Sequence, residues 1–87
     1  MKLDKKALII GFGSAGQKHA KSLEKIIGKR NIFIFSKNNL HSFIKIKRLN
    51  TELNNYIDYV IISTETSRHY FFLKLVDKIF KKKKNFN

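Results

Sequence analysis

The sequence predicts an α/β fold in which helices cover both faces of a parallel sheet of about four strands. The first observation is a set of apolar runs at 7–10, 32–35 and 59–62 that do not alternate with polar residues, as is typical of strands buried on both faces. The second is that segments with helical spacing follow the first and the last of these runs. Because right-handed crossovers join parallel strands, this connectivity predicts a three-layer sandwich with strand order 3-2-1-4.

The first apolar run, Ala7–Ile10, leads directly into three glycines with G-x-G-x-x-G spacing, at Gly11, Gly13 and Gly16. The first glycine permits a sharp turn, the second lets a pyrophosphate approach the backbone, and the third lets the next helix pack closely. The free N–H groups at the start of that helix, together with its dipole, attract phosphate. The spacing and its strand–turn–helix context favour a dinucleotide-binding turn, and a turn that serves packing alone is the alternative.

The first helix is predicted over Ser14–Ile27, with Gly28 as its C-terminal stop. Its inner face is expected to consist of the apolar positions and one histidine: Ala15, His19, Leu23, Ile26 and Ile27. The second strand, Ile32–Phe35, comes one helix after the first strand, as a right-handed βαβ unit requires.

The residues after the second strand bear on the choice of cofactor. An NAD site places a carboxylate here to bind the ribose 2′-hydroxyl. This chain instead has Ser36, Lys37 and Asn38. A hydroxyl and an ammonium group suit a 2′-phosphate better, so these residues favour NADP over NAD. The alternative is that Lys37 is one more surface lysine.

The middle of the chain is predicted to contain an edge strand, a short helix and a further buried strand. Residues 43–47 alternate apolar and charged side chains, which is typical of a half-exposed strand. The short helix is expected over 51–57, with Thr51 as its N-cap. The buried strand Tyr59–Ile62 ends in a hydroxyl-rich loop at 63–67. Because ligands bind beyond the carboxyl ends of parallel strands, this loop is expected to lie at the same edge as the glycine turn.

The last helix is expected to begin near Ser67. Its inner face comprises the apolar positions Phe72, Leu73, Val76, Ile79 and Phe80. Phe71 and Leu75 widen this face, which predicts burial against more than the sheet. Residues 81–87 are expected to form a basic terminal tail of the single domain 1–87. A solvated terminus and the lead-in to a further strand are the alternatives for the four lysines at 81–84.

Composition excludes several classes of protein. The chain has no cysteine, so disulfides and thiolate metal sites are excluded. No apolar stretch approaches the ~20 residues of a membrane span, and no signal peptide is evident, so we expect a cytoplasmic protein without a membrane partner. The 43% content of hydrophobic residues is sufficient for a packed core.

The formal net charge of +13 raises the alternative of a free-standing basic module that binds nucleic acid or an acidic partner. The lysines are spread along the chain, which favours a solvated surface, so nucleic acid is not the expected partner. A nucleic-acid site would need aromatic and basic residues grouped in one groove. The aromatic residues Phe12, Phe33, Phe35 and Phe72 fit core or turn positions instead.

Two motifs resemble the N-terminal half of the Gfo/Idh/MocA oxidoreductases, and together they cover nearly the whole chain. The first is Ala7–His19, which resembles a strand followed by G-x-G-x-x-G-x-x-H. The second is Asp58–Thr64 followed by His69, which resembles a strand, a Thr-Pro-type loop and a histidine that opens the next helix. The resemblance implies a Rossmann-like domain that binds NAD or NADP. The parent reaction would be hydride transfer at a hydroxyl carbon of a sugar, nucleotide-sugar or cyclitol.

The resemblance also implies which residues bind the cofactor. The pyrophosphate would contact the turn residues Gly11, Phe12, Gly13, Ser14, Ala15 and Gly16. Ser36 and Lys37 would meet the adenosine ribose. The nicotinamide side would be flanked by Ser63, Thr64, Thr66 and His69. For His19 a packing or capping role is favoured over a catalytic one, and a loop-capping role is the alternative for His69.

The chain departs from the family pattern in three respects. Glu65 stands where the family often has proline, which implies a less rigid loop. No residue matches the lysine of the family's Glu-Lys-Pro strand or the histidine of its C-terminal substrate domain, so we assign no catalytic residue and no metal ligand. The resemblance therefore implies a truncated cofactor-binding domain without catalysis of its own, whose fourth strand would be an exposed edge prone to association. A further hypothesis is that the chain is an interaction fragment that pairs with a separately encoded substrate domain.

Overall fold

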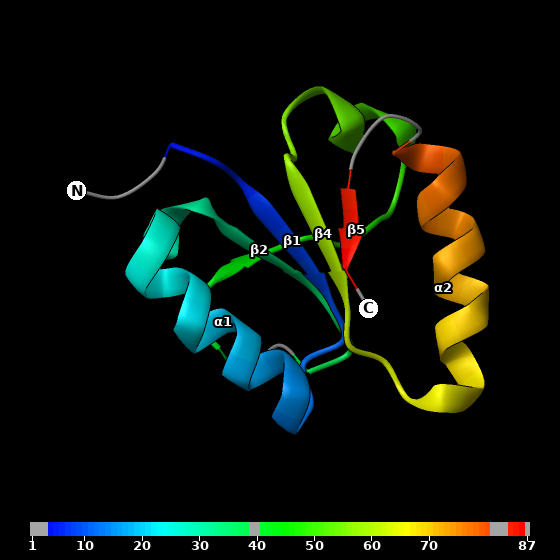
Figure 1. The fold of residues 1–87 in the computed structure, drawn as a ribbon, viewed down its shortest axis with the longest axis horizontal. Helices are drawn as coiled ribbons and strands as arrows, with labels where there is room; N and C mark the ends of the chain where they lie inside the picture. The colour runs from blue at the N-terminus through cyan, green and yellow to red at the C-terminus, as the bar shows by residue number, and fades with distance from the viewer. Residues whose placement is uncertain (1–3, 39–40, 81–83, 87) are drawn as a thin grey trace.

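A computed structural model of the protein describes residues 4–38, 41–80 and 84–86. Its centre is a five-stranded parallel sheet of order β3-β2-β1-β4-β5 (Figure 1). The strands are β1 (Ala7–Ile10), β2 (Ile32–Phe35), β3 (Ile44–Lys45), β4 (Tyr59–Ile62) and β5 (Lys84–Phe86). The predicted Rossmann-like α/β class and the order 3-2-1-4 are confirmed.

The fifth strand corrects two expectations. Lys84–Phe86, which we assigned to a basic tail, pairs in parallel with β4. Strand β4 therefore lies between β1 and β5 and is not an edge. The local pattern does not indicate a strand here, because Lys-Asn-Phe follows a run of lysines and is not a continuous apolar segment.

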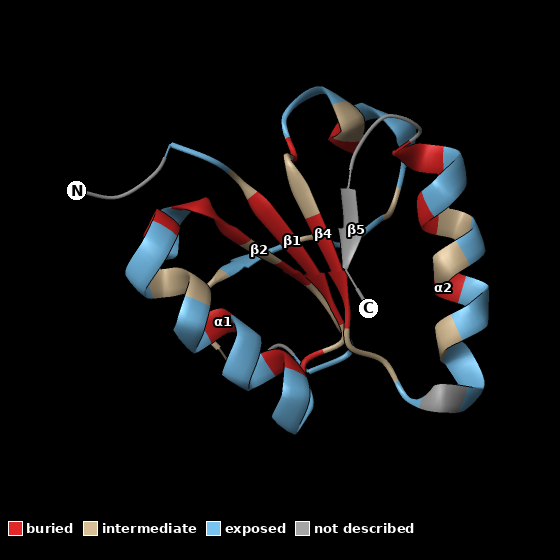
Figure 2. Ribbon diagram, in the orientation of Figure 1, coloured by how far each residue is buried: buried red, intermediate tan, exposed pale blue. Residues whose placement is uncertain are grey.

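The two helices, α1 (Ser14–Ile27) and α2 (Thr66–Ile79), cover opposite faces of the sheet (Figure 1). Successive strand side chains point to opposite faces, so β1 contributes to two cores. Ala7 and Ile9 pack on the α1 side, whereas Leu8 and Ile10 pack on the α2 side. The central strands are buried and both helices expose their outer surfaces (Figure 2). The result is the expected three-layer arrangement.

The inner face of α1 differs from the predicted one. Its buried residues are Gly16, Ala20 and Ile27, with Leu23 half-buried, whereas the expected Ala15, His19 and Ile26 are exposed. His19 therefore has no packing role in the core. The cause is a rotation of the helix by about one residue. Gly16 must face the strand, and the residues in helical register with it then face the sheet.

The segment between β2 and β4 also differs in detail. Strand β3 covers only Ile44–Lys45 of the predicted 43–47, and the short helix is a 3₁₀ helix, η2 (Thr51–Asn55). Its N-cap is Asn50, whose side-chain oxygen accepts the N–H of Glu52 at 3.1 Å, so the predicted cap at Thr51 is wrong. A second 3₁₀ turn, η1 (Lys29–Asn31), joins α1 to β2.

The inner face of α2 is largely as predicted. Phe72, Val76, Ile79 and Phe80 are buried, and Leu73 is half-buried. Phe71 was expected to extend the buried belt, but its side chain is 63% exposed. Among the described residues, neither helix has the length and apolar character needed to cross a membrane.

Candidate functional site

The glycine turn after β1 is held tightly between the ends of its two neighbouring strands. Gly11 has a φ of 95°, a conformation that side chains rarely adopt. Its N–H donates to the carbonyl oxygen of Phe35 at 2.9 Å. A Cβ on Gly11 would lie 3.1 Å from the backbone of Ser63 and from the Thr64 methyl group. The predicted requirement for glycine at this sharp turn is therefore confirmed.

The third glycine lets α1 pack against the turn. A Cβ on Gly16 would overlap the carbonyl oxygen of Gly11 and would lie 2.9 Å from the Ser63 hydroxyl oxygen. That hydroxyl donates to the Gly11 carbonyl, with an oxygen–oxygen distance of 2.8 Å, and lies 3.2 Å from the Ile10 carbonyl oxygen. Ser63 thus ties the end of β4 to the turn.

The second glycine has different surroundings. A Cβ on Gly13 would meet nothing within 4 Å, so free space lies above the turn at this point. Gly13 is the N-cap of α1, and no described side chain caps the helix. Ser14 and Ala15 in the first turn are exposed, and the turn contains no acidic residue. The first-turn N–H groups and the positive end of the helix dipole therefore face an accessible space that suits an anion.

Phe12, between the first two glycines, turns its side chain into the core on the α1 side. Its ring is 8% exposed and lies with its centroid 4.8 Å from that of His41 and 6.0 Å from that of Phe43. The Phe12 carbonyl accepts the side-chain amide of Gln17 at 3.4 Å. Phe12 can therefore contact a ligand at the turn only through its backbone.

His41 supports this aromatic cluster. Its Nδ1 accepts the N–H of Phe43 at 3.2 Å, and its Nε2 is buried without a hydrogen-bond partner in the described structure. Burial lowers the pKa of His41 below its ordinary value, and the positive charge of Lys45 lowers it further. Both effects favour the neutral imidazole over the charged form.

A groove of about 880 Å³ opens on the α2 side of the carboxyl edge of the sheet. Its lining comes from the turn, the ends of β2 and β4, the segment after β3, and α2. The lining residues are Ile10, Gly11, Phe35, Ser36, Lys37, Ile46, Lys47, Arg48, Leu49, Thr64, Arg68, Phe71, Phe72 and Leu75. The groove therefore adjoins the glycine turn at Gly11.

The groove combines apolar walls with positive charge. Its lining contains the cations Lys37, Lys47, Arg48 and Arg68, and no carboxylate is among the described residues that line it. The guanidinium carbon of Arg68 lies 5.4 Å from the centroid of the Phe72 ring, a cation–π distance that holds it against the wall. Opposing charge is absent from this lining, so an anionic ligand is favoured.

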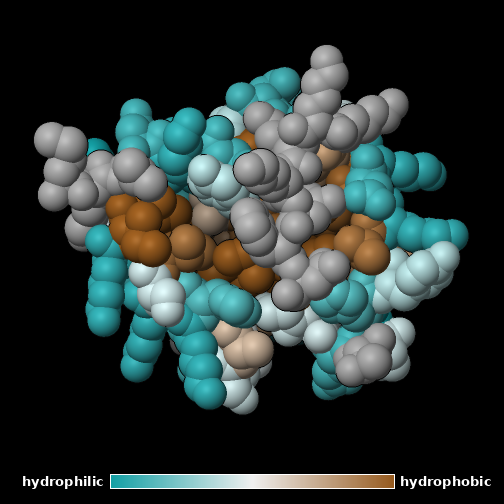
Figure 3. Space-filling model, viewed as in Figure 1, coloured by the Kyte–Doolittle hydropathy of each residue, from teal (hydrophilic) through white to brown (hydrophobic). Residues whose placement is uncertain are grey.

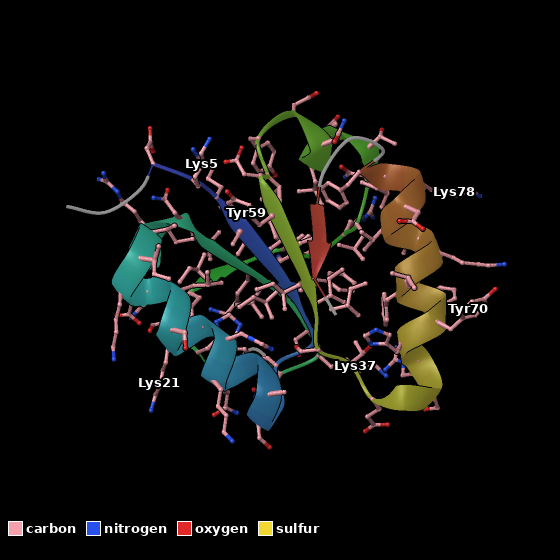
Figure 4. The ribbon with its side chains drawn as sticks, in the orientation of Figure 1. Lys5, Lys21, Lys37, Tyr59, Tyr70 and Lys78 are labelled. Atoms are coloured by element: carbon pink, nitrogen blue, oxygen red, sulfur yellow. The ribbon has the colours of Figure 1, made fainter. Side chains whose placement is uncertain are left out.

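The structure brings part of the predicted site together. Gly11, Ser36, Lys37 and Thr64 share the groove lining. The hydroxyl oxygen of Thr64 is buried and has no hydrogen-bond partner in the described structure, which is the condition expected of a ligand contact. Figure 4 labels Lys37 at the carboxyl end of the sheet.

Ser63 and His69 are not among the described residues that line the groove. Ser63 uses its hydroxyl within the fold. Thr66 is the first residue of α2, and the N–H of half-buried His69 donates to the carbonyl of Glu65 at 3.0 Å within the first turn. Glu65 is exposed at the N-cap and its side chain does not cap the helix.

Sequence reasoning missed Lys47, Arg48, Arg68 and Phe71. The first two follow the short strand β3, in a stretch that the alternating pattern assigned partly to a strand. Ile46 and Leu49, which flank these two cations, pack against the core on the α2 side, and this places the segment in the groove lining. The local pattern pointed only to Phe71, which widens the apolar face of the last helix, and we interpreted this widening as burial.

Comparisons of the chain with family models, with curated proteins and with solved structures found no match. In the part of the chain that the structure describes, no three His, Cys, Asp or Glu side chains are grouped as metal ligands.

Proposed function

We propose that the chain is a dinucleotide-binding domain that holds the ADP part of NAD(P) at the carboxyl edge of its sheet. The observation that carries this proposal is the contrast within the turn. Gly11 and Gly16 are confined by packing, whereas Gly13 opens onto free space at an uncapped helix start. A pyrophosphate there would accept N–H groups from the first turn of α1. A turn built for packing alone would not need a glycine at Gly13.

The groove supports a position for the adenosine. Ser36 and Lys37 lie at the end of β2, next to the turn, and would meet the ribose. The unpartnered Thr64 hydroxyl offers a further hydrogen bond. Apolar walls from Phe35, Phe72 and Leu75 would contact the base. Lys37 favours a ligand with a 2′-phosphate, and the neighbouring cations of the groove support the same preference for NADP over NAD.

The sequence resemblance supports a Gfo/Idh/MocA-like origin, in which the parent protein transfers a hydride between NAD(P) and a hydroxyl carbon of a sugar, nucleotide-sugar or cyclitol. The nicotinamide would supply the hydride chemistry. The residues of this chain would bind and orient the cofactor, and none is assigned a catalytic role. We therefore expect the chain to bind cofactor without turning over substrate.

A thermal-unfolding series with ADP, NAD and NADP tests the proposal. A ligand that binds only the folded state adds about 2.7 kcal/mol of stability at a hundredfold excess over its Kd. We expect all three ligands to raise the Tm, with NADP raising it most. A cooperatively folded chain whose Tm responds to none of them would overturn the proposal. Equal or greater stabilisation by NAD would overturn only the preference for NADP.

A further inference from the structure

We propose that the groove also binds single-stranded nucleic acid. The groove carries the two kinds of contact that such strands need: cations for the phosphates and an exposed aromatic ring for a base. This inference goes beyond the proposed cofactor site and does not depend on it.

The fold gathers charge that is dispersed in the sequence. Lys37 follows β2, Lys47 and Arg48 follow β3, and Arg68 lies in the first turn of α2, yet all four line one groove. All four side chains are exposed, so they remain hydrated and mobile enough to follow a phosphate backbone. A net charge of +13 spread evenly over the surface would not by itself place four cations in one groove.

None of the six acidic residues in the sequence is among the described residues that line the groove. One of them, Asp58, forms a hydrogen bond at the opposite end of the sheet. Asp58 precedes β4, and its carboxylate accepts the N–H of Lys6 at 2.9 Å, at the amino end of the sheet. Figure 3 shows hydrophilic side chains projecting around the rim of the molecule, with hydrophobic side chains in a band across the middle of the view. The lining of the groove at the carboxyl edge places positive side chains next to an apolar wall.

Phe71 supplies the exposed ring. Its side chain is 63% exposed although it lines the groove. An edge-to-face contact with Phe72, at 5.2 Å between ring centroids, holds the Phe71 ring in position. Phe72 in turn contacts Phe35, with 6.2 Å between centroids. An exposed planar ring beside cations favours a nucleobase over an acidic peptide, because every base has a face that stacks on an aromatic ring.

The groove favours a single strand over a duplex. Its volume of about 880 Å³ is that of a pocket for one small ligand, so it admits individual nucleotides. In a duplex the base faces are already stacked on one another. Phe71 can therefore meet a base only where the strand is unpaired.

Fluorescence anisotropy with labelled oligothymidine and oligouridine of about ten nucleotides tests the proposal. We expect both to bind at low salt, and a duplex of the same length to bind more weakly. The double variant Lys47→Ala/Arg48→Ala should bind at least tenfold more weakly and should reduce the slope of log K against log salt by about 1.4. Phe71→Ala should also bind about tenfold more weakly.

The chain provides matched controls. Lys21→Ala/Arg30→Ala removes the same charge from exposed positions outside the groove lining, and Figure 4 labels Lys21 on the outer side of α1. Tyr70→Ala removes a ring that is 65% exposed but does not line the groove. Both controls should retain binding within about twofold. Equal losses in the control and groove variants would overturn the proposal, since binding would then follow net charge alone.

Competition separates this proposal from the cofactor proposal. We expect NADP and ADP to displace the labelled strand. Binding of the strand by a chain that binds no NAD(P) would remove the cofactor function and leave the present inference standing. Binding of NADP without any binding of the strand, or simultaneous binding without displacement, would contradict the present inference and leave the cofactor function intact.

Discussion

The glycine turn and the neighbouring groove form one edge of the sheet, but they are built in different ways. The turn is made of backbone in close contact, with Gly11 confined by Ser63 and Thr64, and Gly16 confined by the Gly11 carbonyl and the Ser63 hydroxyl. The groove is lined largely by long side chains from segments that are distant in the sequence, such as Lys47 and Arg68. The comparison teaches that one edge of the sheet combines a closely packed backbone turn with long exposed side chains. Under the proposed function, the backbone would hold the phosphates and the side chains would select among ligands.

The largest expected effect comes from the packed side of the turn. Gly16→Val should destabilise the fold by at least about 3 kcal/mol, because the new side chain would overlap the Gly11 carbonyl. Urea unfolding followed by circular dichroism measures this change. In a domain of this size such a loss leaves little folded protein. A variant with unchanged stability would show that α1 does not pack on the turn as described.

The matched change at the open side of the turn should act on binding and not on folding. Gly13→Val meets free space and an ordinary φ of −80°, so its cost in stability should be within about 1 kcal/mol. The added side chain should occupy the pyrophosphate position and weaken ADP binding at least tenfold, as measured by calorimetric titration. If a folded Gly13→Val variant bound ADP as tightly as the unchanged protein, the free space at Gly13 would not be the pyrophosphate site.

Ser63 links the turn to β4, so its loss should have an intermediate effect. Ser63→Ala removes the hydrogen bond to the Gly11 carbonyl, for an expected cost of about 1 kcal/mol in the free energy of unfolding. Ser42→Ala, at an exposed position, is the control and should be neutral. If the two variants were equally stable, the hydroxyl would not be fastening the turn.

The smallest effect concerns pH. The folded state lowers the pKa of His41, through burial and then Lys45, below the ordinary value of 6.5. The folded state therefore binds fewer protons at His41 than the unfolded state does. The contribution of His41 to the free energy of unfolding is fully present above pH 6.5, and it is lost as the pH falls toward the folded pKa.

His41→Asn tests this pH dependence, because the amide oxygen can accept the Phe43 N–H without titrating. Urea unfolding at a series of pH values should show a smaller loss of stability for the variant between neutral and mildly acidic pH. An identical pH profile for the two proteins would assign the acid sensitivity to other groups.

The sequence was sufficient for the parts of the fold that follow local rules. The bounds of β1, α1, β2 and β4 agree with the prediction, because continuous apolar runs and the glycine spacing constrain each segment by itself. The positions of Gly11 and Gly16 were likewise predictable, since their packing follows from a strand–turn–helix path.

The rest depended on contacts between distant segments. The prediction misplaced the inner face of α1 because it followed the apolar residues alone. It did not use the constraint that Gly16 must face the sheet. The groove cations at Lys47, Arg48 and Arg68 meet only after β3 and α2 are positioned. The lysines are so numerous in the sequence that no local pattern distinguishes these from the solvated ones.

The central claim is that amide groups exposed at the start of α1 hold a diphosphate. A ¹H–¹⁵N NMR titration of the isotope-labelled chain with ADP tests it most directly. We predict that the largest, saturable shifts occur at the amides of Gly13, Ser14 and Ala15, with smaller shifts at Lys37 and Thr64. Saturable shifts that bypass the Gly13–Ala15 amides, or the absence of any shift, would contradict the claim.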